Sequence, residues 1–120
     1  MMSKKVLVVD DSLFVYEQMK TMLAGTEYEV AGYCMSGEEV FEAYADIRPD
    51  IVTMDIVLPG MDGLETSEKL LKLCPDAKIV VVSSLAYEET ESKAAELGIT
   101  SFVFKPFDAD ELIAALEKLA

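Results

Sequence analysis

Residues 6–12 read Val-Leu-Val-Val-Asp-Asp-Ser, a short run of apolar side chains that ends in two carboxylates and a hydroxyl. A run that is continuous rather than alternating is typical of a strand buried on both faces of a parallel sheet. The same pattern recurs as Ile51 to Met54, Ile79 to Val82 and Phe102 to Phe104. A weaker run, Tyr28 to Cys34, indicates an edge strand. Together these runs predict a parallel sheet of five strands.

Helical patterns lie between the five runs. We expect helices over Ser12 to Leu23, from Ser36 into Val40 and Tyr44, and over Leu64 to Leu73, Glu88 to Leu97 and Asp108 to Leu119. Ser36 with Glu39, and Asp108 with Glu111, have the spacing of a capping box at a helix start. Right-handed crossovers between parallel strands then give an α/β fold of one domain over residues 1–120. Its flavodoxin-like, doubly wound five-stranded sheet has the strand order 2-1-3-4-5.

The charge of the chain excludes several kinds of partner. The formal net charge of the 120 residues is −13, from 23 acidic and 10 basic side chains. Phosphate backbones and anionic lipid surfaces require clustered lysine and arginine, so we expect no direct contact with nucleic acid or membrane. We find no leader segment and no apolar run long enough to span a bilayer, and we therefore expect a cytoplasmic protein.

The chain contains no histidine and two cysteines, Cys34 and Cys74, which belong to no motif. The lack of histidine excludes catalysis by Ser-His or Cys-His pairs and metal sites of the histidine type. Two cysteines cannot form a four-cysteine zinc site, and we interpret them as reduced, buried thiols.

The polar residues that follow the predicted strands carry the chemistry. Asp10 and Asp11 end the first strand, Asp55 the third, Ser83 the fourth and Lys105 the fifth. Ligand sites of such sheets lie beyond the carboxyl ends of the strands, and the first and third strands are neighbours in this order. The three aspartates should therefore converge and repel one another, which requires a cation or protons. Oxygen ligands alone select a hard ion such as Mg²⁺.

Each aspartate taken alone has a simpler interpretation, as a helix cap or a solvated acid at a strand end. The combination of three aspartates with Ser83 and Lys105 favours a site. A carboxylate can act as a nucleophile toward a phosphoryl group, and Mg²⁺ and an ammonium can stabilise the charge on the transferred oxygens. No glycine-rich nucleotide loop is present, so ATP is not the evident donor. A donor phosphohistidine would have to belong to a partner, because this chain has none.

Four stretches together resemble the response regulator receiver domain, in the style of stand-alone, CheY-like receivers. They are Val8-Val9-Asp10-Asp11-Ser12, the segment from Asp55 to Gly63 with Pro59, Val82-Ser83-Ser84, and Lys105-Pro106-Phe107. The resemblance covers the whole chain in order and spacing, and it implies a flavodoxin-like fold.

The resemblance also implies roles for individual residues. Asp55 would be the phosphoacceptor, and Asp10 and Asp11 would form an acidic pocket. Asp55 and the main-chain carbonyl of Val57 would complete the Mg²⁺ ligands.

Three further residues acquire roles from the resemblance. Ser83 would be the switch hydroxyl, and Lys105, preceding a cis peptide bond to Pro106, would pair with a phosphate oxygen. Phe102 matches the switch aromatic, for which plain core packing is the alternative. Val57 and Leu85 are apolar where fast-hydrolysing relatives often carry polar groups, which implies a long-lived phosphorylated state.

These features predict a phosphorylation-controlled switch that is not an enzyme. Its partners would be a sensor histidine kinase or phosphotransfer protein, and a downstream target at the face of helix 4, strand 5 and helix 5. The output would be of chemotaxis, motility or phosphorelay type, and the protein would be a monomer. The alternatives are a receiver excised from a larger response regulator or hybrid kinase and, less favoured, a phospho-aspartyl phosphatase or a flavodoxin-like FMN carrier.

Overall fold

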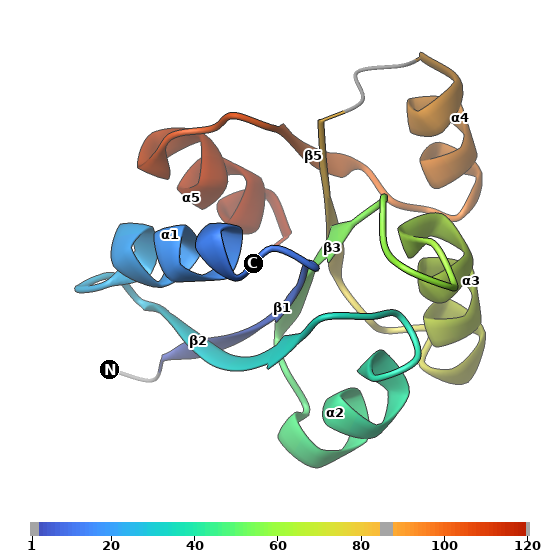
Figure 1. Ribbon diagram of the computed structural model, residues 1–120, viewed down its shortest axis with the longest axis horizontal. Coiled ribbons are helices and arrows are strands. Elements are labelled where there is room, and N and C mark those ends of the chain that lie inside the picture. The colour runs from blue at the N-terminus through green and yellow to red at the C-terminus, as the bar shows by residue number, and fades with distance from the viewer. Residues whose placement is uncertain (1–2, 85–87, 120) are drawn as a thin grey trace.

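The computed structural model describes residues 3–84 and 88–119 (Figure 1). Strands and helices alternate along the chain. The elements are β1 (Lys4–Val9), α1 (Leu13–Leu23), β2 (Tyr28–Cys34), α2 (Val40–Ile47), β3 (Ile51–Asp55), α3 (Gly63–Leu73), β4 (Ile79–Ser83), α4 (Glu88–Glu96), β5 (Ser101–Phe104) and α5 (Ala109–Leu119).

The five strands form one parallel sheet in the order β2-β1-β3-β4-β5, which confirms the predicted fold. The run Tyr28–Cys34 lies at the edge, as its weaker pattern indicates. Between the central strands, Val9 lies opposite Met54 and Asp55 opposite Val82. This register brings the carboxyl ends of β1, β3 and β4 to one edge of the sheet.

Helices cover both faces of the sheet (Figure 1). One core, beneath α1 and α5, contains Val6, Val8, Val80 and Val82 from the strands. The other, beneath α2, α3 and α4, contains the intervening strand residues, and these are Leu7, Val9, Val52, Met54, Ile79 and Val81. Both sets are buried because successive strand side chains point to opposite faces and both faces are covered.

The helix starts agree with the sequence in α1 and α5. The Ser12 hydroxyl accepts the Val15 N–H at 3.3 Å, and in α5 the predicted capping box forms. Glu111 N–H donates to the Asp108 carboxylate at 2.8 Å, and Asp108 N–H donates to the Glu111 carboxylate at 3.2 Å. These bonds satisfy backbone donors that a helix start leaves unpaired.

The start of α2 differs from the prediction. Ser36 does not cap the helix, because a turn precedes the helix start. In this turn the Val40 N–H donates to the Gly37 carbonyl at 3.1 Å. The Glu39 carboxylate instead accepts the Ser36 hydroxyl at 2.7 Å and the Met35 N–H at 3.2 Å. The helix therefore begins at Val40, and the preceding loop remains close to the carboxyl edge of the sheet.

Candidate functional site

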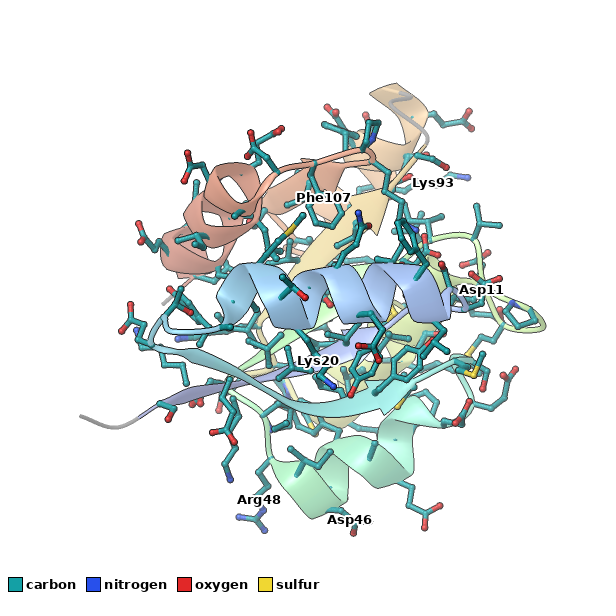
Figure 2. All side chains as sticks on the ribbon, turned by 60° about the vertical axis from the view of Figure 1, so that its left-hand side comes forward. Asp11, Lys20, Asp46, Arg48, Lys93 and Phe107 are labelled. Carbon is teal, nitrogen blue, oxygen red and sulfur yellow. The ribbon has the colours of Figure 1, made fainter. Side chains whose placement is uncertain are left out.

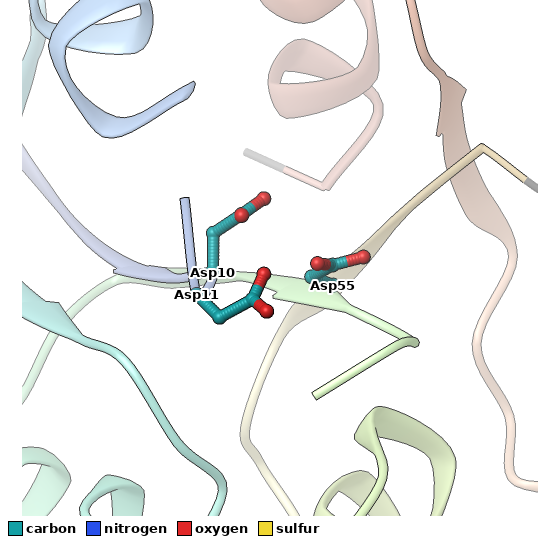
Figure 3. A group of neighbouring side chains, drawn as sticks. All are labelled: Asp10, Asp11 and Asp55. Atoms are coloured by element: carbon teal, nitrogen blue, oxygen red, sulfur yellow. The ribbon is translucent and has the colours of Figure 1, made fainter. Parts of the chain in front are cut away.

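Three carboxylates gather at the carboxyl edge of the sheet. Asp10 and Asp11 follow β1, Asp55 ends β3, and each contributes an oxygen that lies within 4.8 Å of the other two (Figure 3). Asp10 and Asp55 are buried, at 1% and 4% exposure, whereas Asp11 is exposed. Arg48, the only arginine in the sequence, lies away from this cluster, at the end of α2 (Figure 2).

Lys105, directly after β5, supplies the cation at this cluster. Its Nζ lies 2.9 Å from Asp10 Oδ2 and 3.4 Å from Asp55 Oδ2, and its side chain is 22% exposed. The second Asp10 oxygen accepts the Ser12 N–H at 2.9 Å. The peptide bond between Lys105 and Pro106 is cis, as the sequence resemblance implies. One ammonium thus faces three carboxylates, which leaves an excess of negative charge.

Burial governs the titration of Asp55. Loss of solvation raises the pKa of Asp55 from 3.8 to about 6, and the charge of Asp10 adds to this, while Lys105 opposes it. For Lys105 itself, burial disfavours the ammonium, but the hydrogen bond to Asp10 and the charges of Asp55 and Asp10 outweigh burial and raise its pKa. Above pH 6 the site therefore holds ionised Asp55 beside a charged ammonium.

The donor set fits a hard divalent cation. All three converging side chains offer carboxylate oxygens, the ligands that Mg²⁺ prefers, and their mutual repulsion would be relieved by a positive ion. The two cysteines form no soft-metal site. Both are free thiols, but only Cys34 is buried as predicted, whereas Cys74 is half-buried. Burial raises the pKa of Cys34 to about 11. The Val57 carbonyl as a further ligand stays a prediction; Val57 lies two residues beyond Asp55 with its side chain 56% exposed.

The two predicted switch residues lie on the neighbouring strands. Ser83 ends β4, is 2% exposed, and its main-chain carbonyl accepts the Lys105 N–H at 2.8 Å. Phe102 on β5 is partly buried and packs against the core beneath α4. Their switching roles stay predictions, and Leu85, which the resemblance pairs with Val57, lies outside the described residues.

Sequence reasoning missed two residues that shape this edge. Gly63 begins α3 directly against the main chain of Asp55, and Glu38 reaches from the β2–α2 loop to the loop that follows Asp55. The sequence does hold a signal for the role of Gly63, because a glycine directly follows Asp62, which caps α3. The Asp62 carboxylate accepts the Glu65 N–H at 2.8 Å. Nothing local in the sequence indicates the Glu38 contact, which joins residues 23 positions apart.

The fold and the carboxylate site are those of a signalling domain that accepts a phosphoryl group. Comparison with known sequences leads to the same class of protein. Residues 6–117 match the family described as the response regulator receiver domain, and the chain belongs to that family. It is the receiver of a CheY-like response regulator, a phosphoacceptor switch in two-component signalling.

The relatives are similar over nearly the whole chain. The chemotaxis protein CheY of Thermotoga maritima is 38% identical over 119 residues, covering 99% of both chains. CheY of Treponema pallidum is 42% identical over 118 residues, covering 97% of this chain and 80% of its own. CheY of Bacillus subtilis is 32% identical and covers 98% of both.

Solved structures agree with the fold. A chain from the CheX-CheY-BeF3-Mg complex of Borrelia burgdorferi superposes with a TM-score of 0.93 at 26% identity, covering 98% of this chain and 90% of that one. The response regulator domain of Thermotoga maritima CheB gives a TM-score of 0.83 at 30% identity, covering 98% and 93%. Within the described residues, no helix is both long and apolar enough to cross a lipid bilayer.

Proposed function

We propose that Asp55 accepts a phosphoryl group from a phosphohistidine on a sensor histidine kinase or phosphotransfer protein. The observation that carries this proposal is the placement of Asp55, a buried carboxylate beside Lys105 and within reach of two further aspartates. The raised pKa of about 6 leaves this carboxylate ionised and nucleophilic at neutral pH, in a site shielded from water.

The transfer requires little of the protein beyond positioning and charge. An Asp55 oxygen attacks the phosphorus, the bond from phosphorus to the donor imidazole nitrogen breaks, and an acyl phosphate results. Lys105 would stabilise the charge on the phosphoryl oxygens, and Ser83 would donate a hydrogen bond to one of them in the active state. Bound to Asp10, Asp11, Asp55 and the Val57 carbonyl, Mg²⁺ would offset negative charge on the phosphoryl group and its acceptor.

Exposed apolar side chains around the site support a protein as the phosphodonor. Large exposed apolar residues follow three of the strands or end a fourth, and these are Leu13, Phe14, Met35, Val57 and Phe104. These side chains near the strand ends offer apolar area that a docking protein could cover. The Borrelia burgdorferi relative was solved with Mg and BeF3, which supports the same metal here.

The output surface is proposed to be α4, β5 and α5. The helix α4 carries three described acidic side chains, and Ala94 is its buried anchor, so a modest change near Ser83 can shift it. We further propose that residues 1–120 form one receiver domain, which is cytoplasmic and monomeric because its charge of −13 opposes self-association. The relatives favour a chemotaxis output over a phosphorelay.

Phosphorylation from a small donor tests the assignment of Asp55. Incubation with acetyl phosphate and Mg²⁺ is expected to add the mass of one phosphoryl group to the intact protein. The adduct should be stable in acid and labile to hydroxylamine, as an acyl phosphate is. Asp55→Ala should remain unmodified, and full labelling of that variant would refute the assignment.

The lifetime of the adduct tests the role of Val57. Its side chain is exposed beside Asp55 and offers no hydrogen bond to the water that hydrolyses the phosphate. Val57→Asn is expected to speed decay by roughly tenfold, equal to about 1.4 kcal/mol, because an amide can orient that water. Decay is followed by intact mass after removal of the donor. Equal rates for the variant and the wild type would exclude this role.

A further inference from the structure

Glu38 links two loops at the carboxyl edge of the sheet. Its Oε1 accepts the main-chain N–H of Met61 at 3.0 Å, so a side chain of the β2–α2 loop holds the main chain of the β3–α3 loop. Glu38 is exposed, and the hydrogen bond from Met61 is the largest cause of its lowered pKa. Glu38 does not belong to the cluster of Asp10, Asp11 and Asp55.

Two glycines make this approach possible. Gly60 has φ of +74°, and a Cβ there would lie 2.8 Å from Glu38 Oε1. A Cβ at Gly37 would lie 3.0 Å from the Met61 carbonyl oxygen and would overlap the buried Thr66 hydroxyl. A side chain at Gly37 would force the loops apart, and one at Gly60 would displace the Glu38 carboxylate, so the two glycines provide room for the Glu38 contact.

The loop that Glu38 holds joins Asp55 to α3. Its start is fixed by Ile56 and Leu58, each 8% exposed in the core, and by the Gly63 N–H, which donates to the Ile56 carbonyl at 2.8 Å. Its far end is held by Glu38 at Met61. Val57, whose carbonyl is the proposed metal ligand, lies between Ile56 and Leu58 with its side chain in solvent, four residues before the Met61 anchor.

We propose that Glu38 is a positioning residue that sets the affinity of the site for Mg²⁺ by holding the β3–α3 loop. The inference rests on the proposed function, in which the Val57 carbonyl and Asp55 ligate the ion. Glu38 does not ligate the ion itself. It restricts the main chain between Asp55 and α3, so less conformational freedom is lost when the carbonyl binds.

The test compares three variants by calorimetric titration with Mg²⁺ alone. Glu38→Ala removes the acceptor and is expected to weaken binding by about tenfold, the lower end for residues that orient metal ligands. Glu38→Gln should stay within about twofold of wild type, because its amide oxygen still accepts the Met61 N–H. Glu42→Ala removes an exposed acid on α2 and should also change affinity by less than about twofold, because screened surface charges act weakly.

Hydrogen exchange at the Met61 amide reports the contact itself. Exchange should accelerate in Glu38→Ala and remain slow in Glu38→Gln, both with and without Mg²⁺. If Met61 exchange accelerates while Mg²⁺ affinity is unchanged, Glu38 does not position the site. If Glu38→Gln binds as weakly as Glu38→Ala, the carboxylate charge acts instead of the hydrogen bond, which also overturns the proposal.

Mg²⁺ binding by the wild type and by Glu38→Ala distinguishes a failure of the metal site from a failure of the positioning role. Wild-type protein that does not bind Mg²⁺ at all contradicts the proposed metal site. Wild-type protein that binds Mg²⁺ with an affinity unaffected by Glu38→Ala contradicts only the positioning role.

Discussion

Asp55→Asn is expected to stabilise the metal-free protein at pH 8 by about 3 kcal/mol. Burial raises the pKa of Asp55 from 3.8 to about 6. The folded state therefore binds this proton more tightly than the unfolded chain does, and ionisation at high pH costs stability. A shift of about two units at 1.36 kcal/mol each gives about 3 kcal/mol, and the uncharged asparagine avoids this cost.

The pH dependence gives the sign of this effect. Well below pH 3.8 Asp55 is protonated in both states, so the variant and the wild type should be equally stable. The difference in stability should grow between about pH 4 and pH 6 and level off above about pH 6, where Asp55 is ionised in both states. Urea unfolding at several pH values measures it. Asp46→Asn, at an exposed acid on α2 (Figure 2), should change little at any pH. A gain at pH 8 no larger than that of Asp46→Asn would show that Asp55 ionisation carries no such cost.

Mg²⁺ should reduce the difference in stability between the wild type and Asp55→Asn. A cation that binds the folded state stabilises it by mass action, and the wild type offers one more carboxylate than Asp55→Asn. We therefore expect millimolar Mg²⁺ to raise the melting temperature of the wild type more than that of the variant. An equal rise in the melting temperature of both proteins would show that Asp55 is not a ligand of Mg²⁺.

Gly63→Ala is expected to destabilise the fold by about 3 kcal/mol and to disrupt the site. A Cβ at this first position of α3 would overlap the carbonyl oxygen of Asp55 and lie 2.8 Å from the Ile56 Cα. Helix propensity alone predicts a gain of about 1 kcal/mol for alanine over glycine. The overlap with main-chain atoms outweighs that gain, because neither the helix start nor the end of β3 can move without repacking the core.

Gly25→Ala is the matched control for Gly63→Ala. Gly25 has φ of +80°, and a Cβ there would meet no atom within 4 Å, so alanine introduces only backbone strain of about 1–2 kcal/mol. Unfolding in urea compares the two variants, and Mg²⁺ titration should show weaker binding in Gly63→Ala alone. If Gly63→Ala is as stable as the wild type, the close packing of α3 on Asp55 does not constrain the protein.

The positions of the main site residues could be predicted because parallel strands end at a common edge. Asp10, Asp55 and Ser83 end buried apolar runs, so the strand order alone places them together. Lys105 is different, because β3 and β4 lie between β5 and β1, and its 2.9 Å contact with Asp10 depends on a long side chain that reaches across the carboxyl edge of the sheet. Continuous apolar runs and the strand order thus place the three strand-end residues at one edge.

The contacts between loops could not be predicted in this way. Ser36 and Glu39 have the spacing of a capping box, yet the turn at Gly37 delays α2 to Val40. At that turn Gly37 packs closely against Thr66 and Met61, a tertiary contact that local propensity does not reveal. The Glu38 contact has the same origin.

The strand order also has a consequence for how the protein folds. Asp10, Asp55 and Lys105 are far apart in the chain, and the ion pairs between them form only when β5 has docked beside β4. A partly folded chain with β1 and β3 paired would hold the carboxylates together before the ammonium arrives. The repulsion among these carboxylates is thus offset only once Lys105 arrives, so the strand that carries the ammonium also relieves the charge imbalance of the other two.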